Sequence, residues 1–269
     1  MDKRCPILVL IMSIYLRNTI YLRFSINNTM EPGQKYDFKA GAMLLIDKPL
    51  EWTSFDVVNK VRYALKKALN VRKIKVGHAG TLDPLATGLL ILCTGKFTKK
   101  IDTYQSQYKV YDGSIRLGAT TPSYDAETEI NATFPLEGLT DEMIKDAVPH
   151  FVGEIDQTPP MFSAIKVNGQ PLYKKARKGE DVKIKSRRIT IHDFKITDIR
   201  LPEVDFEVKC SKGTYIRSLA YDFGQKLDNG GYLTKLRRTH IGEHALDDAW
   251  QLDDLITHIQ ENYHPEITE

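Results

Sequence analysis

Cysteine is scarce in this sequence, and no hydrophobic run is long enough to cross a membrane. The three cysteines, Cys5, Cys93 and Cys210, form no C-x-x-C pair, so neither a disulfide framework nor a cysteine zinc site is predicted. This cysteine usage favours a reducing compartment, and we expect the cytoplasm. The apolar run at residues 5–15 is shorter than the roughly 20 residues that a membrane-spanning helix needs, so no membrane association is predicted.

Internal repeats and low-complexity segments are lacking as well. With 269 residues, of which 42% are hydrophobic and 27% charged, the composition excludes a collagen-like or largely disordered chain. The length suffices for one large domain, or two smaller ones, with a hydrophobic core.

Residues 1–29 carry the whole net charge of +3, because four basic residues there face one acid, Asp2. The chain from Met30 onward is neutral overall. Two basic residues followed by an apolar run resemble the start of a signal peptide, but no small-x-small cleavage pattern follows. Three interpretations stay open: an upstream start assignment with Met30 as the biological start, a secretion signal, and a dispensable extension. Residues 1–29 are therefore treated as a leader that need not belong to the native protein.

Beyond the leader the charges are segregated into blocks. Residues 57–82 carry seven basic side chains and no acid, and residues 166–188 carry nine basic side chains against two acids. Residues 117–156 and 244–269 are strongly acidic. Dense basic stretches can bind a phosphate backbone even in a neutral protein, although solvated helix faces give the same pattern.

The hydrophobic patterns predict strands and helices in irregular alternation. Strands are expected at 42–47, 111–117 and 204–210, and helices at 55–69, from Thr140 and at 216–227. Thr53, with Asp56 three residues later, approximates a capping box before the first of these helices. The order favours a mixed α/β protein over a regular βαβ repeat.

Two pattern matches that would indicate a bound cofactor fail on inspection. His240-Ile-Gly-Glu-His244 fits a zinc pattern, but Gly242 would interrupt the helix on which such ligands lie. The Gly-rich stretch that ends at Lys96 has the wrong spacing for a phosphate-binding loop and lacks the Ser or Thr that follows its lysine. We therefore predict no metal and no other cofactor.

The segment from Gly77 to Gly88 is the richest candidate site. Its glycines and the Asp83-Pro84 pair predict a tight loop before an apolar run at 89–92. An isolated Asp-Pro is usually only a turn. Here the loop follows the densest basic stretch of the chain, where a carboxylate held among cations could act as a nucleophile.

Together with motifs on both sides of this segment, these residues resemble those of the bacterial tRNA pseudouridine synthases that modify the uridine at position 55 of the T loop. The motifs occur in that family's order between residues 42 and 240: Lys48-Pro49 with Thr53-Ser54, the Gly77–Gly88 loop, Lys109-x-Tyr111, Gln157-x-Pro159-Pro160, Tyr173-x-x-Ala176-Arg177, Gly213-Thr-Tyr215-Ile-Arg217 and Leu236-Arg237-Arg238. The whole set is specific, whereas any single motif would be weak. Glu51 departs from the family, since many relatives have glycine there.

The resemblance implies a pseudouridine synthase fold: an α/β protein with a mixed, mainly antiparallel central sheet, flanking helices and an RNA-binding insertion. It also implies roles for seven residues. Asp83 would attack C1′ of the ribose or assist cleavage of the glycosidic bond, Tyr215 would remove the C5 proton, and Arg217 would pair with Asp83. The implied substrate-binding residues are His78, Tyr111, Leu236 and Lys48. Without the resemblance, Tyr111 reads as a half-buried strand residue and Leu236 as core.

The implied reaction detaches uracil from C1′, rotates it and rejoins it through C5, with no net redox change. The target base must leave its stack first, and an aromatic side chain such as Tyr111 could receive it. Asp83 and Arg217 are far apart in the sequence. The resemblance therefore requires a long-range contact between the loop and the helix at 216–227.

The expected organisation is a catalytic domain at 40–242 and a short acidic tail at 243–269, too short for the small RNA-binding PUA domain with which relatives often continue. RNA binding would then fall to the basic blocks, and a mobile insertion within 157–188 is expected to close over the T arm. The candidate backbone-binding residues are Lys66, Lys67, Lys73, Lys174, Lys175 and Arg177. We expect a monomer whose partner is tRNA. The alternatives are a catalytically idle tRNA-binding or folding protein on the same scaffold and a uracil-removing glycosidase.

Overall fold

The structure is a computed structural model that describes residues 36–167, 169–180 and 182–263. The expected leader at 1–29 and Cys5 lie outside the described residues. Within them, no helix combines the length and the apolar character that crossing a membrane requires.

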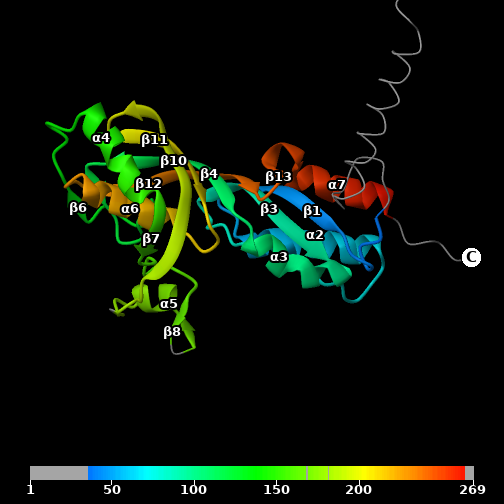
Figure 1. Ribbon diagram of the computed structural model, residues 1–269. Coiled ribbons are helices and arrows are strands. Elements are labelled where there is room, and N and C mark those ends of the chain that lie inside the picture. The colour runs from blue at the N-terminus through cyan, green and yellow to red at the C-terminus, as the bar shows by residue number, and fades with distance from the viewer. Residues whose placement is uncertain (1–35, 168, 181, 264–269) are drawn as a thin grey trace, which may run out of the picture.

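A ten-stranded sheet forms the centre of the molecule, in the order β14-β1-β3-β12-β4-β11-β10-β7, with β13 added to β12 and β2 to β3 (Figure 1). Its strands are β1 (Met43–Lys48), β2 (Val76–His78), β3 (Ala86–Thr94), β4 (Lys109–Leu117), β7 (Gly153–Gln157), β10 (Arg187–Arg200), β11 (Glu203–Cys210), β12 (Gly231–Ile241), β13 (His244–Ala245) and β14 (Trp250–Gln251). Among the described strands of this sheet, β12 pairs with β3 and β1 with β14 in parallel, and the other pairs are antiparallel. The mixed, mainly antiparallel sheet confirms the expected fold class.

The remaining elements flank this sheet. The α-helices are α2 (Ser54–Ala68), α3 (Ile101–Ser106), α4 (Asp141–Ala147), α5 (Leu172–Ala176), α6 (Ile216–Lys226) and α7 (Leu252–Asn262). Short 3-10 helices are η1 (Gly95–Lys100), η2 (Val148–Phe151) and η3 (Leu246–Asp248), and two small hairpins pair β5 (Ala119–Thr120) with β6 (Ala132–Thr133) and β8 (Lys166–Val167) with β9 (Gln170–Pro171).

Helix α2 shows how local sequence fixes an element. The Thr53 hydroxyl accepts the Asp56 backbone N–H, and the Asp56 carboxylate accepts the Thr53 backbone N–H. This reciprocal pair confirms the predicted capping box and starts the helix at Ser54. The apolar stripe of α2 then faces the sheet and the basic residues Lys66 and Lys67 lie exposed in its last turn.

The hydrophobic core is divided between the two ends of the sheet. At one end, α6 packs on β4, β10 and β11, and at the other, α2 and α7 cover β1 and β3 (Figure 1). The opposite face of β1 and β3 is covered by apolar side chains of η1 and α3. Strand β3 is thus buried on both faces, which explains its continuous apolar run at 89–92.

Residues 243–263, which composition alone sets apart as an acidic tail, contribute to this core. Strand β14 pairs with β1, and α7 packs against α2. Leu252, Leu255, Ile256 and Ile259 form the buried stripe of α7, while its acidic residues face outward. The acidic composition therefore describes only the exposed face of a helix that belongs to the domain.

The insertion leaves the sheet between two neighbouring strands. Strand β7 ends at Gln157 and β10 begins at Arg187, and these two residues are register partners. The chain between them forms β8, β9 and α5, which project away from the sheet in Figure 1. The insertion thus has its two ends side by side.

If α7 belongs to the core, shortening Leu255 must weaken the fold. Leu255 is fully buried, and we expect Leu255→Ala to lower the free energy of unfolding by about 2–5 kcal/mol in urea denaturation. Thr257→Ala, on the exposed face of the same helix, should change it by less than about 0.5 kcal/mol. Equal effects of the two substitutions would show that α7 is not packed as described.

Candidate active site

A cavity of about 620 Å³ opens beside the loop that precedes β3, and α3, β4, β10, β12 and the start of α6 complete its walls. Five residues singled out from the sequence line it: Asp83, Tyr111, Tyr215, Arg217 and Leu236. They come from four separate stretches of the chain, so only the folded sheet brings them together.

The loop that carries Asp83 is held by two buried cations. Lys48 is 0% exposed, and its ammonium donates hydrogen bonds to the carbonyls of Trp52 (2.6 Å), Pro49 (2.8 Å) and Pro84 (3.4 Å). On the other side, the guanidinium of Arg238 donates to the carbonyls of Leu89 (2.7 Å) and Gly80 (3.0 Å). The loop is therefore fixed from both sides before any substrate arrives.

Three further features restrict the same loop. Ser54 exchanges hydrogen bonds with the backbone of Leu82. Gly88 has a φ of +101°, and a side chain there would place its Cβ 2.3 Å from the Arg238 carbonyl oxygen, so glycine is required. Glu51 has a φ of 66°, in the region that favours glycine, and its N–H donates to the Pro84 carbonyl at 2.9 Å. Glu51 thus forms a left-handed turn although it is not a glycine.

Arg217 makes the expected long-range contact with Asp83. Its guanidinium lies 2.9 Å from an Asp83 carboxylate oxygen and 3.4 Å from one of Asp125. It also donates to the backbone carbonyls of Phe162 (2.9 Å) and Ser123 (3.1 Å). The Arg217 side chain is 5% exposed, whereas that of Asp83 is 43% exposed. The buried cation therefore orients a carboxylate that remains open to the cavity.

Asp125 is a member of this site that the sequence did not reveal. Its carboxylate is buried, accepts the Ser123 hydroxyl at 2.6 Å and accepts the Glu127 N–H at 2.9 Å. Burial raises the pKa of Asp125, and the Arg217 guanidinium acts in the opposite direction. Nine acids crowd residues 117–156, so charge alone did not distinguish this one. The only sequence signal was its local Ser-x-Asp turn.

Tyr111 and Leu236 supply the apolar surface of the cavity. Tyr111 lies on β4, and Leu236 lies on the neighbouring strand β12 opposite Gly113. Burial raises the pKa of Tyr111, so its phenol stays protonated at neutral pH. Tyr215 precedes the first residue of α6, and the guanidinium of Arg187 lies 4.6 Å from the centre of its ring.

Two of the residues expected to bind substrate do not line the cavity. The ammonium of Lys48 donates its hydrogen bonds to the three carbonyls described above. His78 lies on β2, and its buried Nδ1 has no hydrogen-bond partner among the described residues. Burial, together with the charge of Arg238, lowers the pKa of His78 and keeps the imidazole neutral. In this structure, Lys48 supports the backbone of the loop, and His78 is not among the residues that line the cavity.

The candidate RNA-binding residues occupy three regions, the first of which is the exposed last turn of α2 with Lys66 and Lys67. Lys73 lines a separate hollow of about 390 Å³ whose other basic residues are Lys39, Lys75, Lys96 and Lys99. This hollow adjoins η1, which continues into α3 and so into the cavity wall. Lys174, Lys175 and Arg177 lie on or next to α5 in the insertion, where Lys175 faces Glu180 (3.8 Å) and Arg177 faces Glu127 (3.1 Å). Figure 1 shows α5 and α3 well separated.

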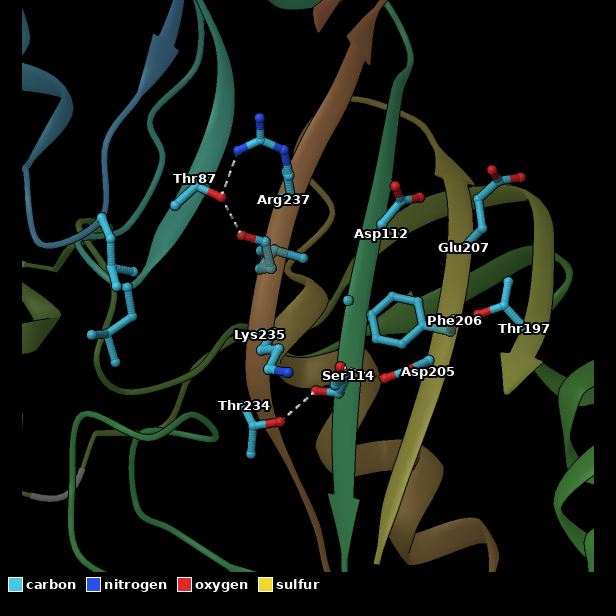
Figure 2. A pocket seen from close by; sticks show the side chains of 14 residues that line it. Thr87, Asp112, Ser114, Thr197, Asp205, Phe206, Glu207, Thr234, Lys235 and Arg237 are labelled. Carbon is cyan, nitrogen blue, oxygen red and sulfur yellow. Dashed lines mark hydrogen bonds between the residues drawn. The ribbon is translucent and has the colours of Figure 1, made fainter. Parts of the chain in front are cut away.

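A second hollow of about 810 Å³ lies against the other face of the sheet, to which Asp112 and Ser114 point because strand side chains alternate. Figure 2 shows its polar side chains over β12, β4 and β11, with Arg237 bonded to Thr87 and Thr234 bonded to the carbonyl of Ser114. Arg237 also pairs with Asp47 at 2.7 Å. Although this hollow is larger, Asp83, Tyr215 and Arg217 lie elsewhere, so we assign the chemistry to the first cavity.

Known proteins resemble this chain in sequence. Residues 66–216 match the model of the TruB family of pseudouridylate synthases, N-terminal domain. A tRNA pseudouridine synthase B of Flavobacterium johnsoniae is 58% identical over 214 residues, which cover 79% of this chain and 93% of that protein. A tRNA pseudouridine synthase B of Phocaeicola vulgatus is 52% identical over 217 residues, covering 81% and 92%.

Solved structures resemble it in fold. A chain of a Cbf5–Nop10–Gar1 complex superimposes with a TM-score of 0.62 at 25% identity, over 85% of this chain and 60% of that one. A chain of an H/ACA RNP bound to a substrate RNA containing 2′-deoxyuridine gives 0.60 at 25% identity, over 82% and 54%. This chain therefore spans between 54% and 60% of the length of these two solved chains.

The role assigned to Lys48 predicts a loss of stability on substitution. Lys48→Met should lower the free energy of unfolding by about 3 kcal/mol, because each buried carbonyl left without a donor costs about 1–3 kcal/mol. Lys145→Met, at an exposed position on α4, is the matched control and should have little effect.

The difference between wild type and Lys48→Met should also depend on pH. Burial lowers the pKa of Lys48 from 10.5 to about 8, so the folded protein binds fewer protons than the unfolded chain between these values. The stability of wild type relative to the variant should therefore rise from pH 8 towards pH 10.5, as urea denaturation would show. A difference that falls over this range would contradict the burial of the ammonium.

Proposed function

The chain belongs to the TruB family of pseudouridylate synthases, and from that premise we propose that it converts uridine to pseudouridine at position 55, in the T loop of tRNA. It is an isomerase. The observation that carries the finer proposal is the Asp83–Arg217 contact, which presents one oriented carboxylate to a cavity large enough for a nucleotide.

The reaction begins with the target nucleotide leaving its stack and entering the cavity. Unstacking costs a few kcal/mol, and stacking on an aromatic ring returns about 1–3 kcal/mol. Tyr111 offers that ring, with Leu236 beside it on the next strand. The uracil is thereby held next to the loop that carries Asp83.

Asp83 then acts at C1′, either by forming a bond to it or by assisting departure of the base. The N1–C1′ bond breaks and the uracil leaves with the bonding electrons. After the ring rotates, C5 bonds to C1′, and any bond between Asp83 and C1′ breaks so that the carboxylate is regenerated. Tyr215 takes the proton that C5 must lose, while its own hydroxyl proton passes to the ring nitrogen or to solvent. One C–N bond is exchanged for one C–C bond and one proton ends on the ring nitrogen or in solvent, so atoms and electrons balance without an external reactant.

Cations surround the place where negative charge develops. The cavity is lined by six basic side chains and two acidic ones: Lys109, Arg187, Arg188, Lys212, Arg217 and Arg238, and Asp83 and Asp102. Lys109 is buried and donates to the carbonyls of Gln105 (2.6 Å) and Gln107 (2.7 Å), while burial lowers its pKa to about 8. This positive surplus supports binding of the phosphates beside the target and stabilisation of the departing uracil anion.

RNA binding beyond the cavity is assigned to two basic regions. The first region is the hollow beside η1 that is lined by Lys39, Lys73, Lys75, Lys96 and Lys99. The second is the basic cluster on and next to α5 in the insertion. An RNA arm whose target nucleotide enters the cavity would meet cations on both sides. Lys66 and Lys67 extend the exposed basic surface of α2.

Substitution of Asp83 tests the catalytic assignment. With tRNA that carries [5-³H]uridine, wild type should release tritium, and Asp83→Asn should be slower by at least about a thousandfold, because the group that acts at C1′ is lost. Asp102→Asn removes the other carboxylate of the cavity and should cost less than tenfold. A transcript with cytidine at position 55 should release none.

The alternatives give different results in the same assay. An idle RNA-binding scaffold would release no tritium from wild type. A glycosidase would produce free uracil in place of pseudouridine. Equal release by wild type and Asp83→Asn would remove Asp83 as the catalyst while leaving the isomerase intact.

Salt dependence tests the RNA-binding surface. The logarithm of the tRNA binding constant should fall linearly with the logarithm of salt concentration, by roughly 0.7–0.9 per phosphate neutralised. Replacing Lys73, Lys96 and Lys99 by Ala should reduce the slope by about 2–3, whereas Lys145→Ala should leave it unchanged. A flat salt response of wild type would exclude phosphate contacts as the main source of affinity.

A further inference from the structure

The backbone of Tyr215 is held by one side chain, that of Gln157. The Gln157 amide oxygen accepts the Tyr215 N–H at 2.8 Å, and the Gln157 amide nitrogen donates to the Tyr215 carbonyl at 3.0 Å. A side-chain amide here pairs with both polar groups of one residue, as the backbone of a neighbouring strand would. Tyr215 has extended dihedral angles, and no side chain caps the helix that follows it.

Among the residues that the structure describes, the side-chain amide of Gln157 bonds only to Tyr215. Gln157 is 1% exposed, and it is the last residue of β7, at the edge of the sheet. Both atoms of its amide are used by the Tyr215 peptide groups. A buried glutamine whose amide oxygen and amide nitrogen both bond to one residue fixes the place of that residue.

The ring of Tyr215 is held from a second direction by Arg187. The guanidinium lies 4.6 Å from the ring centre and also donates to the carbonyl of Gly213, two residues before Tyr215. Arg187 opens β10 and is the register partner of Gln157. The backbone and the ring of Tyr215 are thus held by two residues that stand side by side.

Gln157 and Arg187 stand at the two ends of the insertion. The first residues of the insertion bind the first turn of α6, directly after Tyr215. The Ser218 hydroxyl donates to the carbonyl of Thr158 at 2.8 Å, and Arg217 donates to that of Phe162 at 2.9 Å. The base of the insertion and the catalytic turn at 215–218 therefore form one hydrogen-bonded unit. Besides the Arg217–Asp83 contact, the backbone of the Asp83 loop has supports of its own, Lys48 and Arg238.

We propose that Gln157, together with Arg187, is a positioning residue for Tyr215 and sets the distance over which the C5 proton is removed. The inference rests on the proposed function, in which Tyr215 takes that proton. Proton transfer requires hydrogen-bond reach, and a misplacement of about 1 Å can cost about a hundredfold in rate. Cleavage of the N1–C1′ bond depends on Asp83, so loss of Gln157 slows the later step selectively.

The test compares single-turnover rates on tRNA carrying [5-¹H]uridine or [5-²H]uridine at the target position. For Gln157→Ala we expect pseudouridine formation to slow by about 10–100-fold and the isotope ratio to rise at least twofold above that of wild type, because deprotonation becomes rate-limiting. The Kd for tRNA should change less than twofold. Gln225→Ala, the same truncation on the exposed side of α6, should match wild type in all three quantities.

Two further variants separate positioning from loss of folding. Gln157→Glu keeps the acceptor for the Tyr215 N–H but loses the donor, so its isotope ratio should lie between those of wild type and Gln157→Ala. Arg187→Met, at a partly exposed position, should raise the ratio without lowering the thermal unfolding temperature. A slower Gln157→Ala with the wild-type isotope ratio and a lower unfolding temperature would overturn the proposal and leave Gln157 a structural residue.

If the proposed function is wrong, the same experiments give a different result. In that case wild type itself makes no pseudouridine, or Tyr215→Phe turns over at the wild-type rate with an unchanged isotope ratio. If Tyr215→Phe is impaired and Gln157→Ala, Gln157→Glu and Arg187→Met keep the wild-type ratio, Tyr215 retains its role and only the positioning proposal is overturned.

Discussion

The buried guanidinium of Arg217 is the contact on which the arrangement of the site depends. A cation removed from water is costly unless its donors are matched, and Arg217 reaches four partners: Asp83, Asp125 and the carbonyls of Ser123 and Phe162. These partners belong to three segments far apart in the sequence. Satisfying one buried charge therefore brings the Asp83 loop, the turn of Asp125 and the base of the insertion together at the start of α6.

Around this contact, the cavity has two separately supported sides. Lys48, Ser54 and Arg238 hold the loop that presents Asp83, and Gln157 with Arg187 holds Tyr215. The proposed isomerisation gives the protein no external reactant to activate. What it must supply is the relative position of a carboxylate, an aromatic platform and a proton acceptor, and rigid support of each fits that requirement.

The sequence predicted what depends on local pattern or on the resemblance. The capping box at Thr53, the buried run of β3 and the Asp83–Arg217 contact all occur in the structure. Asp125 and Gln157 could not be assigned a role, because their partners lie 92 and 58 positions away in the sequence. The local patterns in which they stand, a Ser-x-Asp turn and the Gln157-x-Pro159-Pro160 motif, do not identify those partners. At residues 243–263 the acidic composition describes the outer face of α7, whose apolar stripe is buried in the structure. The sequence could not show that Lys48 is buried. Because it is buried, its ammonium bonds to backbone carbonyls, including one of the Asp83 loop.

The central claim, that Arg217 joins these segments, is tested most directly by amide hydrogen exchange in Arg217→Lys. A lysine keeps the charge but cannot reach four partners with one planar group. The account predicts that residues 79–86 and 158–163 lose protection together, by at least about tenfold, while the amides of β1 and β3 exchange as in wild type. Unchanged protection of both segments, or loss in only one, would contradict it.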